Sequence, residues 1–370
     1  MEKIMIYLDN GATTKPSPEA IHALTQAMQE HFANPSSMHQ AGLDSHALLA
    51  NAKATMLSLL GATGKGDIHF TSGGTESNNL AILGALGHKK QIITSKAEHP
   101  SVLRAIESQK SRGYTVDYVP LDQHGITTPE ALAQLVSKDT ALVAIMDTNN
   151  ETGAVNNIQA LGQVIKTNSN AHFHVDAVAS FTKKPLDLTY VDTLAISSHK
   201  VHGPGATGAL YVKKGVNIKP LFYGGSAHSK VRPTTENAAT AHAFAVASKN
   251  AYANMEVNTQ HVQALKNSLL ELSIQNMQFN SLPNSLPYIV NLSILGIKGQ
   301  VVVNALSTKQ IYISTGAACN ERTFNILQSL GHDKSIYESA LRVSFSSYNN
   351  LDDVARLKEA LVEVANTLRF

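Results

Sequence analysis

The sequence has no tryptophan and only one cysteine among its 370 residues. One cysteine cannot form an internal disulfide, which fits a reducing cytoplasm. The apolar runs are far shorter than the roughly 20 residues that a membrane helix needs, and residues 1–11 do not resemble a signal peptide. Lysine and arginine number 30 against 28 acidic residues, and a net charge of +2 gives no reason to expect a nucleic-acid or membrane-surface partner. We therefore expect a cytoplasmic protein.

The first predicted helix begins after Ser17, which can cap it, because Pro18 suits the first helical position. Its apolar residues recur at helical spacing, and they are Ile21, Leu24, Met28 and Phe32. Short apolar runs then alternate with amphipathic helical stretches. The runs are 68–73, 91–95, 115–121, 141–148, 172–177, 193–198 and 209–212. This alternation predicts βαβ crossovers and an α/β fold with a mostly parallel sheet.

The pattern changes after about residue 250, where a long helical stretch precedes further strands, and this part reads as a smaller α+β domain. In a parallel sheet, ligand-binding residues lie just past the carboxyl ends of the strands. The polar clusters of this chain follow its predicted strands in that way.

The segment TSGGTESN (71–78) follows a predicted strand and opens a helix. Its glycines and the free N–H groups of a helix N-terminus could bind a phosphate group. A turn that only caps the helix is an equally good interpretation of this segment alone. The segment is not a nucleotide P-loop, because the GxxxxGK[ST] pattern is absent.

Two charged residues follow later strands. Asp176 ends the strand HFHVDA, where it could pair with a protonated pyridine nitrogen, although a helix cap or an internal ion pair explains an isolated aspartate as well. Lys200 ends the segment SSHK, where partial enclosure would lower its pKa and favour reaction with an aldehyde. His172 and His174 share one strand face, but no third ligand is spaced to join them, so we expect no metal.

Cys319 lies among small residues in TGAACNE (315–321), just after a predicted strand. A buried structural thiol is the usual role of a lone cysteine. The setting of Cys319 instead favours an accessible loop and a reactive thiol.

Several motifs together resemble the class V aminotransferase family of pyridoxal 5'-phosphate (PLP) fold type I, and specifically its NifS/IscS-like cysteine desulfurases. They run almost from end to end of the chain. They are YLDNGATT (7–14), NPSS (34–37), TSGGTES (71–77), EHP (98–100), NNETG (149–153), HVDA (174–177), SSHK (197–200) and the segment 232–237. The resemblance implies a large PLP-binding domain over 15–250 with a seven-stranded sheet. It also implies a small α+β domain, formed by 1–14 and 251–370, that carries the Cys319 loop.

The resemblance also implies a homodimer that converts L-cysteine to L-alanine with PLP. Lys200 would hold the cofactor covalently, His99 would stack on its ring and assist proton transfer, and Cys319 would receive sulfur as a persulfide. An acceptor protein would then take this sulfur for iron–sulfur or other sulfur assembly. The remaining implied cofactor ligands are Gly74, Thr75, Asn150, Asp176, Ser197 and His199, with Thr235 from the other subunit. The implied substrate ligands are Arg342 and Asn34.

The sequence departs from the family pattern around the cofactor. Ala179 stands where the family usually has a glutamine that hydrogen-bonds the cofactor's ring oxygen, and the segment 226–234 lacks the usual Gln-Glu pair and the glycine before Thr235. These changes suggest a specialised or slow desulfurase. Two alternatives stay open: a PLP-dependent lyase or aminotransferase acting on another amino acid such as selenocysteine, and a non-catalytic scaffold or sulfur carrier.

Overall fold

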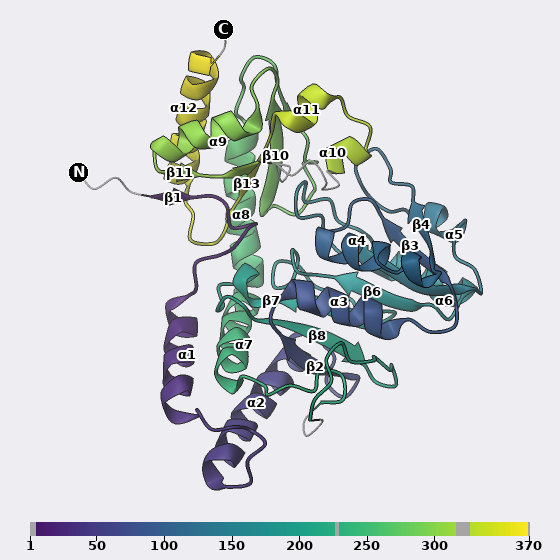
Figure 1. The fold of residues 1–370 in the computed structure, drawn as a ribbon. Helices are drawn as coiled ribbons and strands as arrows, with labels where there is room; N and C mark the ends of the chain where they lie inside the picture. The colour runs from purple at the N-terminus through teal and green to yellow at the C-terminus, as the bar shows by residue number, and fades with distance from the viewer. Residues whose placement is uncertain (1–4, 226–228, 316–325, 369–370) are drawn as a thin grey trace.

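A computed structural model describes residues 5–225, 229–315 and 326–368. Cys319 and the altered residues 226–228 lie outside these ranges. The described chain forms two parts, each with helices and a sheet, which are joined by two consecutive long helices, α7 (Ala238–Ala253) and α8 (Met255–Leu270) (Figure 1). The predicted domain boundary at residue 250 falls in the last turn of α7.

A seven-stranded sheet forms the centre of the first part. Its strands are β2 (Gly66–Thr71), β3 (Gln91–Ser95), β4 (Thr115–Val119), β5 (Thr140–Met146), β6 (His172–Asp176), β7 (Thr193–Ser197) and β8 (Gly208–Lys213). Their order is β2-β8-β7-β6-β5-β3-β4, and β8 alone runs in the direction opposite to the other six strands. The predicted mostly parallel sheet is therefore confirmed.

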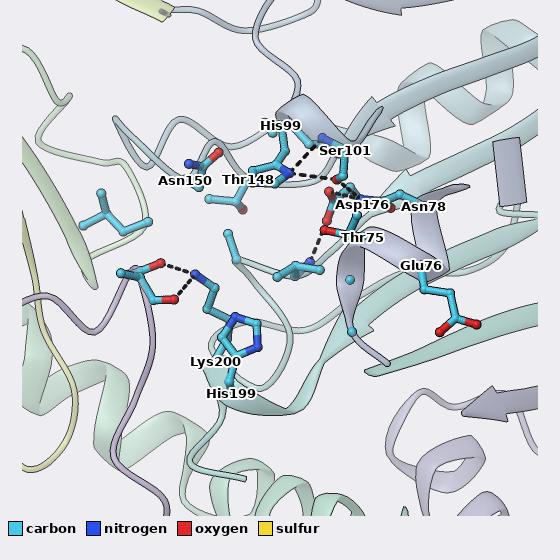
Figure 2. Close-up of a pocket in the computed structure, with 18 of the residues that line it drawn as sticks. Thr75, Glu76, Asn78, His99, Ser101, Thr148, Asn150, Asp176, His199 and Lys200 are labelled. Atoms are coloured by element: carbon cyan, nitrogen blue, oxygen red, sulfur yellow. Dashed lines mark hydrogen bonds between the residues drawn. The ribbon is translucent and has the colours of Figure 1, made fainter. Parts of the chain in front are cut away.

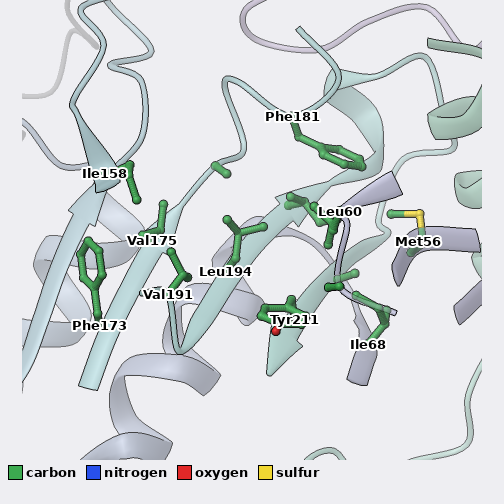
Figure 3. Close-up of a cluster of buried hydrophobic side chains, with 14 of the residues drawn as sticks. Met56, Leu60, Ile68, Ile158, Phe173, Val175, Phe181, Val191, Leu194 and Tyr211 are labelled. Atoms are coloured by element: carbon green, nitrogen blue, oxygen red, sulfur yellow. The ribbon is translucent and has the colours of Figure 1, made fainter. Parts of the chain in front are cut away.

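Helices cover both faces of this sheet. They are α1 (Pro18–Glu30), α2 (Gln40–Leu59), α3 (Gly74–Ala85), α4 (Pro100–Glu107), α5 (Pro129–Ala133), α6 (Ile158–Asn168) and α7. Because side chains alternate along a strand, Phe173 and Val175 of β6 pack in the core with α2, α6 and α7 (Figure 3). The opposite face packs against α3 and α4. His172 and His174 point to that second face, toward α3.

The second part of the chain holds the smaller sheets. A four-stranded antiparallel sheet has the order β12-β13-β10-β9, and a parallel pair joins β1 to β11. The strands are β1 (Ile6–Tyr7), β9 (Met277–Phe279), β10 (Ile289–Ile294), β11 (Ile311–Tyr312), β12 (Ser314–Thr315) and β13 (Ala340–Ser344). The other helices are α9 (Gly299–Thr308), α10 (Ile326–Ser329), α11 (Lys334–Glu338) and α12 (Leu351–Leu368). Among the described residues, no helix combines the length and apolar character needed to cross a membrane.

The first helix packs on a face that its apolar pattern did not predict. Ser17 caps α1 as expected, but the buried side chains are three alanines, Ala20, Ala23 and Ala27, on the side toward α7. Small side chains let the two helices approach closely. The larger apolar residues Ile21 and Met28 are exposed in the single chain, at 51% and 62%.

Candidate active site

A cavity of about 500 Å³ lies past the carboxyl ends of β6 and β7 (Figure 2). The N-terminus of α3 and the start of α4 border it on the large-sheet side. The segment after β1 and Arg342 of β13 border it on the side of the smaller sheets. Its volume lies within the range of small-molecule sites. Residues from both parts of the chain therefore meet in one concave site.

The N-terminus of α3 faces this cavity with its backbone N–H groups. Gly73 adopts φ 151°, which only glycine tolerates readily, and it offers no side chain to cap the helix. Gly74 packs closely against the turn that follows β6, because a Cβ atom on Gly74 would lie 2.8 Å from Val178 Cγ2. Thr75 also lines the cavity. The predicted phosphate-binding turn is thus an open helix terminus that attracts anions.

An ion pair fastens this turn to the segment before α7. Arg232 donates from Nε to Glu76 Oε1 at 2.5 Å and from Nη2 to Glu76 Oε2 at 3.2 Å. Glu76 Oε2 also accepts the N–H of Ser72 at 2.7 Å. The pKa of Glu76 is lowered by these hydrogen bonds, although its partial burial acts in the opposite direction. The pair fixes the entrance to α3.

Asp176 is a buried carboxylate that borders the cavity. It is 6% exposed and ends β6. Its Oδ1 accepts the N–H of Val178 at 3.0 Å, and its Oδ2 accepts from Asn78 Nδ2 at 2.7 Å (Figure 2). Both of its oxygens thus accept a hydrogen bond, and a cationic ring nitrogen in the cavity would complete its pairing.

His99 caps α4 and lines the same cavity. Its Nδ1 accepts the N–H of Ser101 at 3.2 Å and lies 2.7 Å from Ser101 Oγ. Burial is the main cause that lowers the pKa of His99, with Lys200 and Arg342 adding to it, while Asp176 opposes the shift. His99 is therefore neutral near pH 7, with its proton on Nε2.

Lys200 ends a short 3₁₀ turn (Ser198–Lys200) directly after β7. Its Nζ donates to the carbonyl oxygens of Gly11 and Ala12, the latter at 2.8 Å (Figure 2). Burial lowers the pKa of Lys200 to about 7, and the positive charges of Arg342 and Lys183 add to this effect. A large fraction of this amine is therefore neutral near pH 7 and able to act as a nucleophile or base.

Ser197 is the last residue of β7, and His199 lies within the turn that follows it. Ser197 Oγ lies 2.8 Å from His199 Nδ1, and His199 lines the cavity while Ser197 is buried behind it. Burial lowers the pKa of His199 to about 4, with Lys200 and Lys183 contributing. A neutral imidazole here can donate a hydrogen bond to an anion from its free nitrogen.

Arg342 reaches the cavity from β13. Its Nη2 pairs with Asp9 Oδ1 at 3.0 Å, and its Nη1 donates to the carbonyl oxygen of Asn150 at 3.1 Å. Its buried Nε has no hydrogen-bond partner among the residues that the structure describes. Each terminal nitrogen of the guanidinium carries a second hydrogen, and Arg342 lines the cavity, so these hydrogens are the donors that could bind a carboxylate.

The structure brings most of the predicted site residues together. Those that line the cavity are Gly74, Thr75, His99, Asn150, Asp176, His199, Lys200 and Arg342. Asn34 and Thr235 do not line it: Asn34 is an exposed loop residue whose Oδ1 accepts the N–H of Ser36, and Thr235 is exposed. Cys319 lies outside the described residues. The roles of all these residues stay predictions.

Asn78 and Lys183 are two of the cavity residues that were not predicted as site residues from the sequence. Asn78 lies one turn inside α3 and bonds Asp176, a contact that local sequence does not reveal. Lys183 donates from Nζ to the carbonyl oxygen of Ala179 at 3.0 Å and lies 5.5 Å from the ring centroid of Tyr288. Burial lowers the pKa of Lys183 to about 8, and Arg342 adds to the shift. The only sequence signal for Lys183 is that it lies four residues after Ala179, where the sequence departs from the family pattern.

The fold agrees with the comparisons to known proteins. Residues 6–357 match the model of the class V aminotransferases, so the chain belongs to this family. It is 36% identical to the cysteine desulfurase IscS of Methanosarcina thermophila, over 100% of this chain and 94% of that protein.

Solved structures give the same grouping. A NifS-like protein superposes with a TM-score of 0.92 at 31% identity, over 99% of this chain and 100% of that one. The structure of SspA in complex with cysteine gives a TM-score of 0.81 at 28% identity, over 93% of this chain and 99% of that one. Within its family the chain is thus placed with the NifS/IscS-like cysteine desulfurases, and the enzymes of this family are in general PLP-dependent.

Proposed function

We propose that this enzyme uses PLP to convert L-cysteine to L-alanine and transfers the sulfur to Cys319 as a persulfide. One observation carries the proposal: Lys200, Asp176 and the open N-terminus of α3 border the same cavity. An amine of lowered pKa, a buried carboxylate and an anion-binding helix end match the aldehyde, pyridine nitrogen and phosphate of PLP.

The donors around the cavity fit PLP. Its phosphate would lie at the N–H groups of α3, with the Thr75 hydroxyl and the imidazole of His199 as further donors. Its ring nitrogen would face Asp176, and His99 would lie against the ring. When bound, PLP supplies an electron sink that stabilises negative charge on the substrate's Cα. The methyl group of Ala179 offers no donor to the ring oxygen.

Lys200 and His99 would handle the protons. The pKa of Lys200, lowered to about 7, allows its neutral amine to take the proton from the substrate's Cα near neutral pH. His99 is neutral, and the hydrogen bond from Ser101 to its Nδ1 directs its Nε2 proton away from Ser101. It could therefore donate a proton from Nε2.

Arg342 would bind the substrate's carboxylate. Its Nη2 is paired with Asp9 and its Nη1 with Asn150, and each of these nitrogens has a second hydrogen that would donate to the carboxylate. These fixed contacts restrict the guanidinium to one orientation, which orients the substrate's amino group toward Lys200.

The sulfur step requires the thiolate of Cys319. The chain approaches this residue through β12, in which Ser314 pairs with Arg342. Cys319 is four positions after Thr315, and four residues of chain span at most about 14 Å. The Cys319 sulfur forms a bond to the substrate's sulfur, the C–S bond of the substrate breaks, and its electron pair stays on carbon. Protonation of that carbon yields alanine, and no external oxidant or reductant is needed.

A homodimer and a sulfur acceptor complete the proposal. The exposed apolar residues Ile21, Met28 and Phe32 gather on and after α1, and a second subunit would cover them. Thr235 is exposed in the single chain, which suits a contact to the other subunit's cofactor. An acceptor protein in the cytoplasm would then take the persulfide sulfur for iron–sulfur or other sulfur assembly.

The test is alanine release from L-cysteine by the PLP-loaded protein, with Cys319→Ser as the matched variant. We expect alanine from the parent protein and its loss in the variant, while PLP stays bound to both. Alanine release that persists in Cys319→Ser would instead indicate a lyase that needs no thiol. A yellow, PLP-loaded protein that releases no alanine from L-cysteine would refute the proposed substrate.

A further inference from the structure

A continuous row of hydrogen bonds leads from Asp176 across the face of the sheet that α3 covers. Asp176 Oδ2 accepts from Asn78 Nδ2 at 2.7 Å, and Asn78 Oδ1 lies 3.0 Å from His174 Nε2. The other ring nitrogen, His174 Nδ1, lies 2.9 Å from Thr193 Oγ1. Thr193 Oγ1 is in turn 2.8 Å from His172 Nε2. Asn78, His174 and Thr193 are each 1% exposed or less.

The carboxylate of Asp176, at one end of this row, determines the direction of every hydrogen bond in it. A carboxylate only accepts, so Asn78 presents its amide nitrogen to Asp176 and its oxygen to His174. His174 must then donate from Nε2. Burial lowers the pKa of His174 to about 3 and that of His172 to about 4, so both rings are neutral. The unprotonated Nδ1 of His174 accepts the Thr193 hydroxyl proton, and the Thr193 oxygen accepts from His172 Nε2. All donors therefore point toward Asp176.

The same amide also contacts Ser101, which is the hydrogen-bond partner of His99. The second hydrogen of Asn78 Nδ2 goes to Ser101 Oγ at 2.8 Å. His99 Nδ1 accepts the backbone N–H of Ser101 at 3.2 Å, so the Ser101 hydroxyl, 2.7 Å away, donates to the same nitrogen while its oxygen accepts from Asn78. Asn78 thus uses both amide hydrogens and its oxygen, and its orientation determines whether Asp176 receives a donor from it.

We propose that His174 and Thr193 are positioning residues of this enzyme: through the amide of Asn78, they hold Asp176 as an oriented acceptor. The inference rests on the proposed use of PLP, because Asp176 and His99 are the groups expected at the edge and the face of its ring. Aligned hydrogen bonds also polarise one another, which strengthens the last donor onto Asp176.

Loss of one link has a defined consequence. Without the Thr193 hydroxyl, His174 Nδ1 has lost its donor, and the tautomer protonated at Nδ1 becomes accessible. Its Nε2 lone pair would then face the oxygen of Asn78, and relief of that repulsion by rotation of the amide would place the oxygen against Asp176. Asp176 would bind a cationic ring nitrogen in a less favourable orientation.

The test compares Thr193→Val, which keeps the side-chain shape but removes the hydroxyl, with Thr193→Ser, which keeps the hydroxyl. Thr94→Val is a matched control, because Thr94 is equally buried in β3 of the same sheet and its hydroxyl donates only to the carbonyl of Ala144 at 2.9 Å. Thermal stability of all three variants measures the structural effect. PLP affinity and the absorbance spectrum of the PLP-bound form measure the effect on the site.

We expect Thr193→Val to weaken PLP binding about tenfold, the size expected for one charge-assisted hydrogen bond, and to shift the absorbance maximum. Thr193→Ser should restore both, and Thr94→Val should change neither. If Thr193→Val lowers thermal stability as Thr94→Val does but leaves affinity and spectrum at parent values, the residue is structural and the inference is wrong.

A second measurement does not depend on PLP. Nitrogen NMR of the histidine-labelled protein without PLP should show His174 and His99 protonated at Nε2, with the tautomer of His174 disturbed in Thr193→Val and that of His99 unchanged. A parent protein with His174 protonated at Nδ1 would overturn the inference even if PLP binds. Correct tautomers in a protein that fails to bind PLP would instead refute the proposed cofactor and leave the hydrogen-bond row established.

Discussion

Lys200 should destabilise the PLP-free protein, and its replacement by methionine should make that protein more stable. The residue is largely buried, and its amine donates to two backbone carbonyls, those of Gly11 and Ala12. A fall of its pKa from 10.5 to about 7 corresponds to about 5 kcal/mol of unfavourable free energy for the charged form, at about 1.36 kcal/mol per pKa unit. Losing two hydrogen bonds to carbonyls offsets about 2 kcal/mol. We therefore expect Lys200→Met to gain about 3 kcal/mol.

The gain must depend on pH with a definite sign. Between pH about 7 and 10.5 the unfolded chain keeps a proton on Lys200 that the folded protein has released. Unfolding then takes up a proton, so the parent protein becomes more stable as the pH rises through this window. The penalty is full below pH 7 and disappears above 10.5. The advantage of Lys200→Met should accordingly be largest near pH 7 and shrink toward pH 10.

The assay is urea unfolding of both PLP-free proteins at one protein concentration across this pH range. Lys184→Met is the contrasting variant. Lys184 pairs with the buried carboxylate of Asp147 at 2.9 Å, so its loss should destabilise the protein by about 3 kcal/mol. A Lys200→Met protein no more stable than the parent, or an advantage that does not change with pH, would refute the assignment of Lys200 as a buried amine of lowered pKa.

Three further changes address the cofactor site. Ala179→Gln should strengthen PLP binding about fivefold, the value of one hydrogen bond to the ring oxygen, and an absorbance titration that finds no gain would show that another donor already serves there. Gly74→Ala should weaken PLP binding and lower thermal stability, because its Cβ would lie 2.8 Å from Val178 Cγ2, and unchanged values would mean that Val178 moves freely. Arg232→Ala should destabilise the protein by about 2 kcal/mol near pH 7 in urea unfolding, because it leaves the mostly buried carboxylate of Glu76 without its partner. This loss of stability should shrink as the pH falls through the lowered pKa of Glu76. A loss of stability that does not change with pH would contradict the ion-pair explanation.

Local pattern determined much of the fold in advance. The strands β6 and β7 are short, mostly apolar runs, and they end at Asp176 and Ser197, each one residue before the end of the predicted run. A parallel sheet brings such ends to one edge, which is why residues far apart in sequence could be predicted to share a site. The glycines of the segment 71–78 also predicted the open start of α3, because glycine readily adopts a positive φ such as the 151° of Gly73.

Other features depended on contacts between distant residues. Asn78 bonds Asp176 across 98 positions of sequence, and nothing near Asn78 distinguishes it from an ordinary helix residue. His172 and His174 were expected to pack without a metal, but the sequence could not show that Thr193 links them. For α1, the apolar spacing predicted a helix correctly but not which side packs, because alanines suffice where two helices approach closely.

The most direct test of the central claim is the mass of the Cys319-containing peptide after the PLP-loaded protein has reacted with one equivalent of L-cysteine. The account predicts that this peptide gains the mass of one sulfur atom, that alanine appears in equal amount, and that the Lys200→Ala variant shows neither. Alanine formed without added sulfur on Cys319, or sulfur added in the Lys200→Ala variant, would contradict a persulfide made by these two residues.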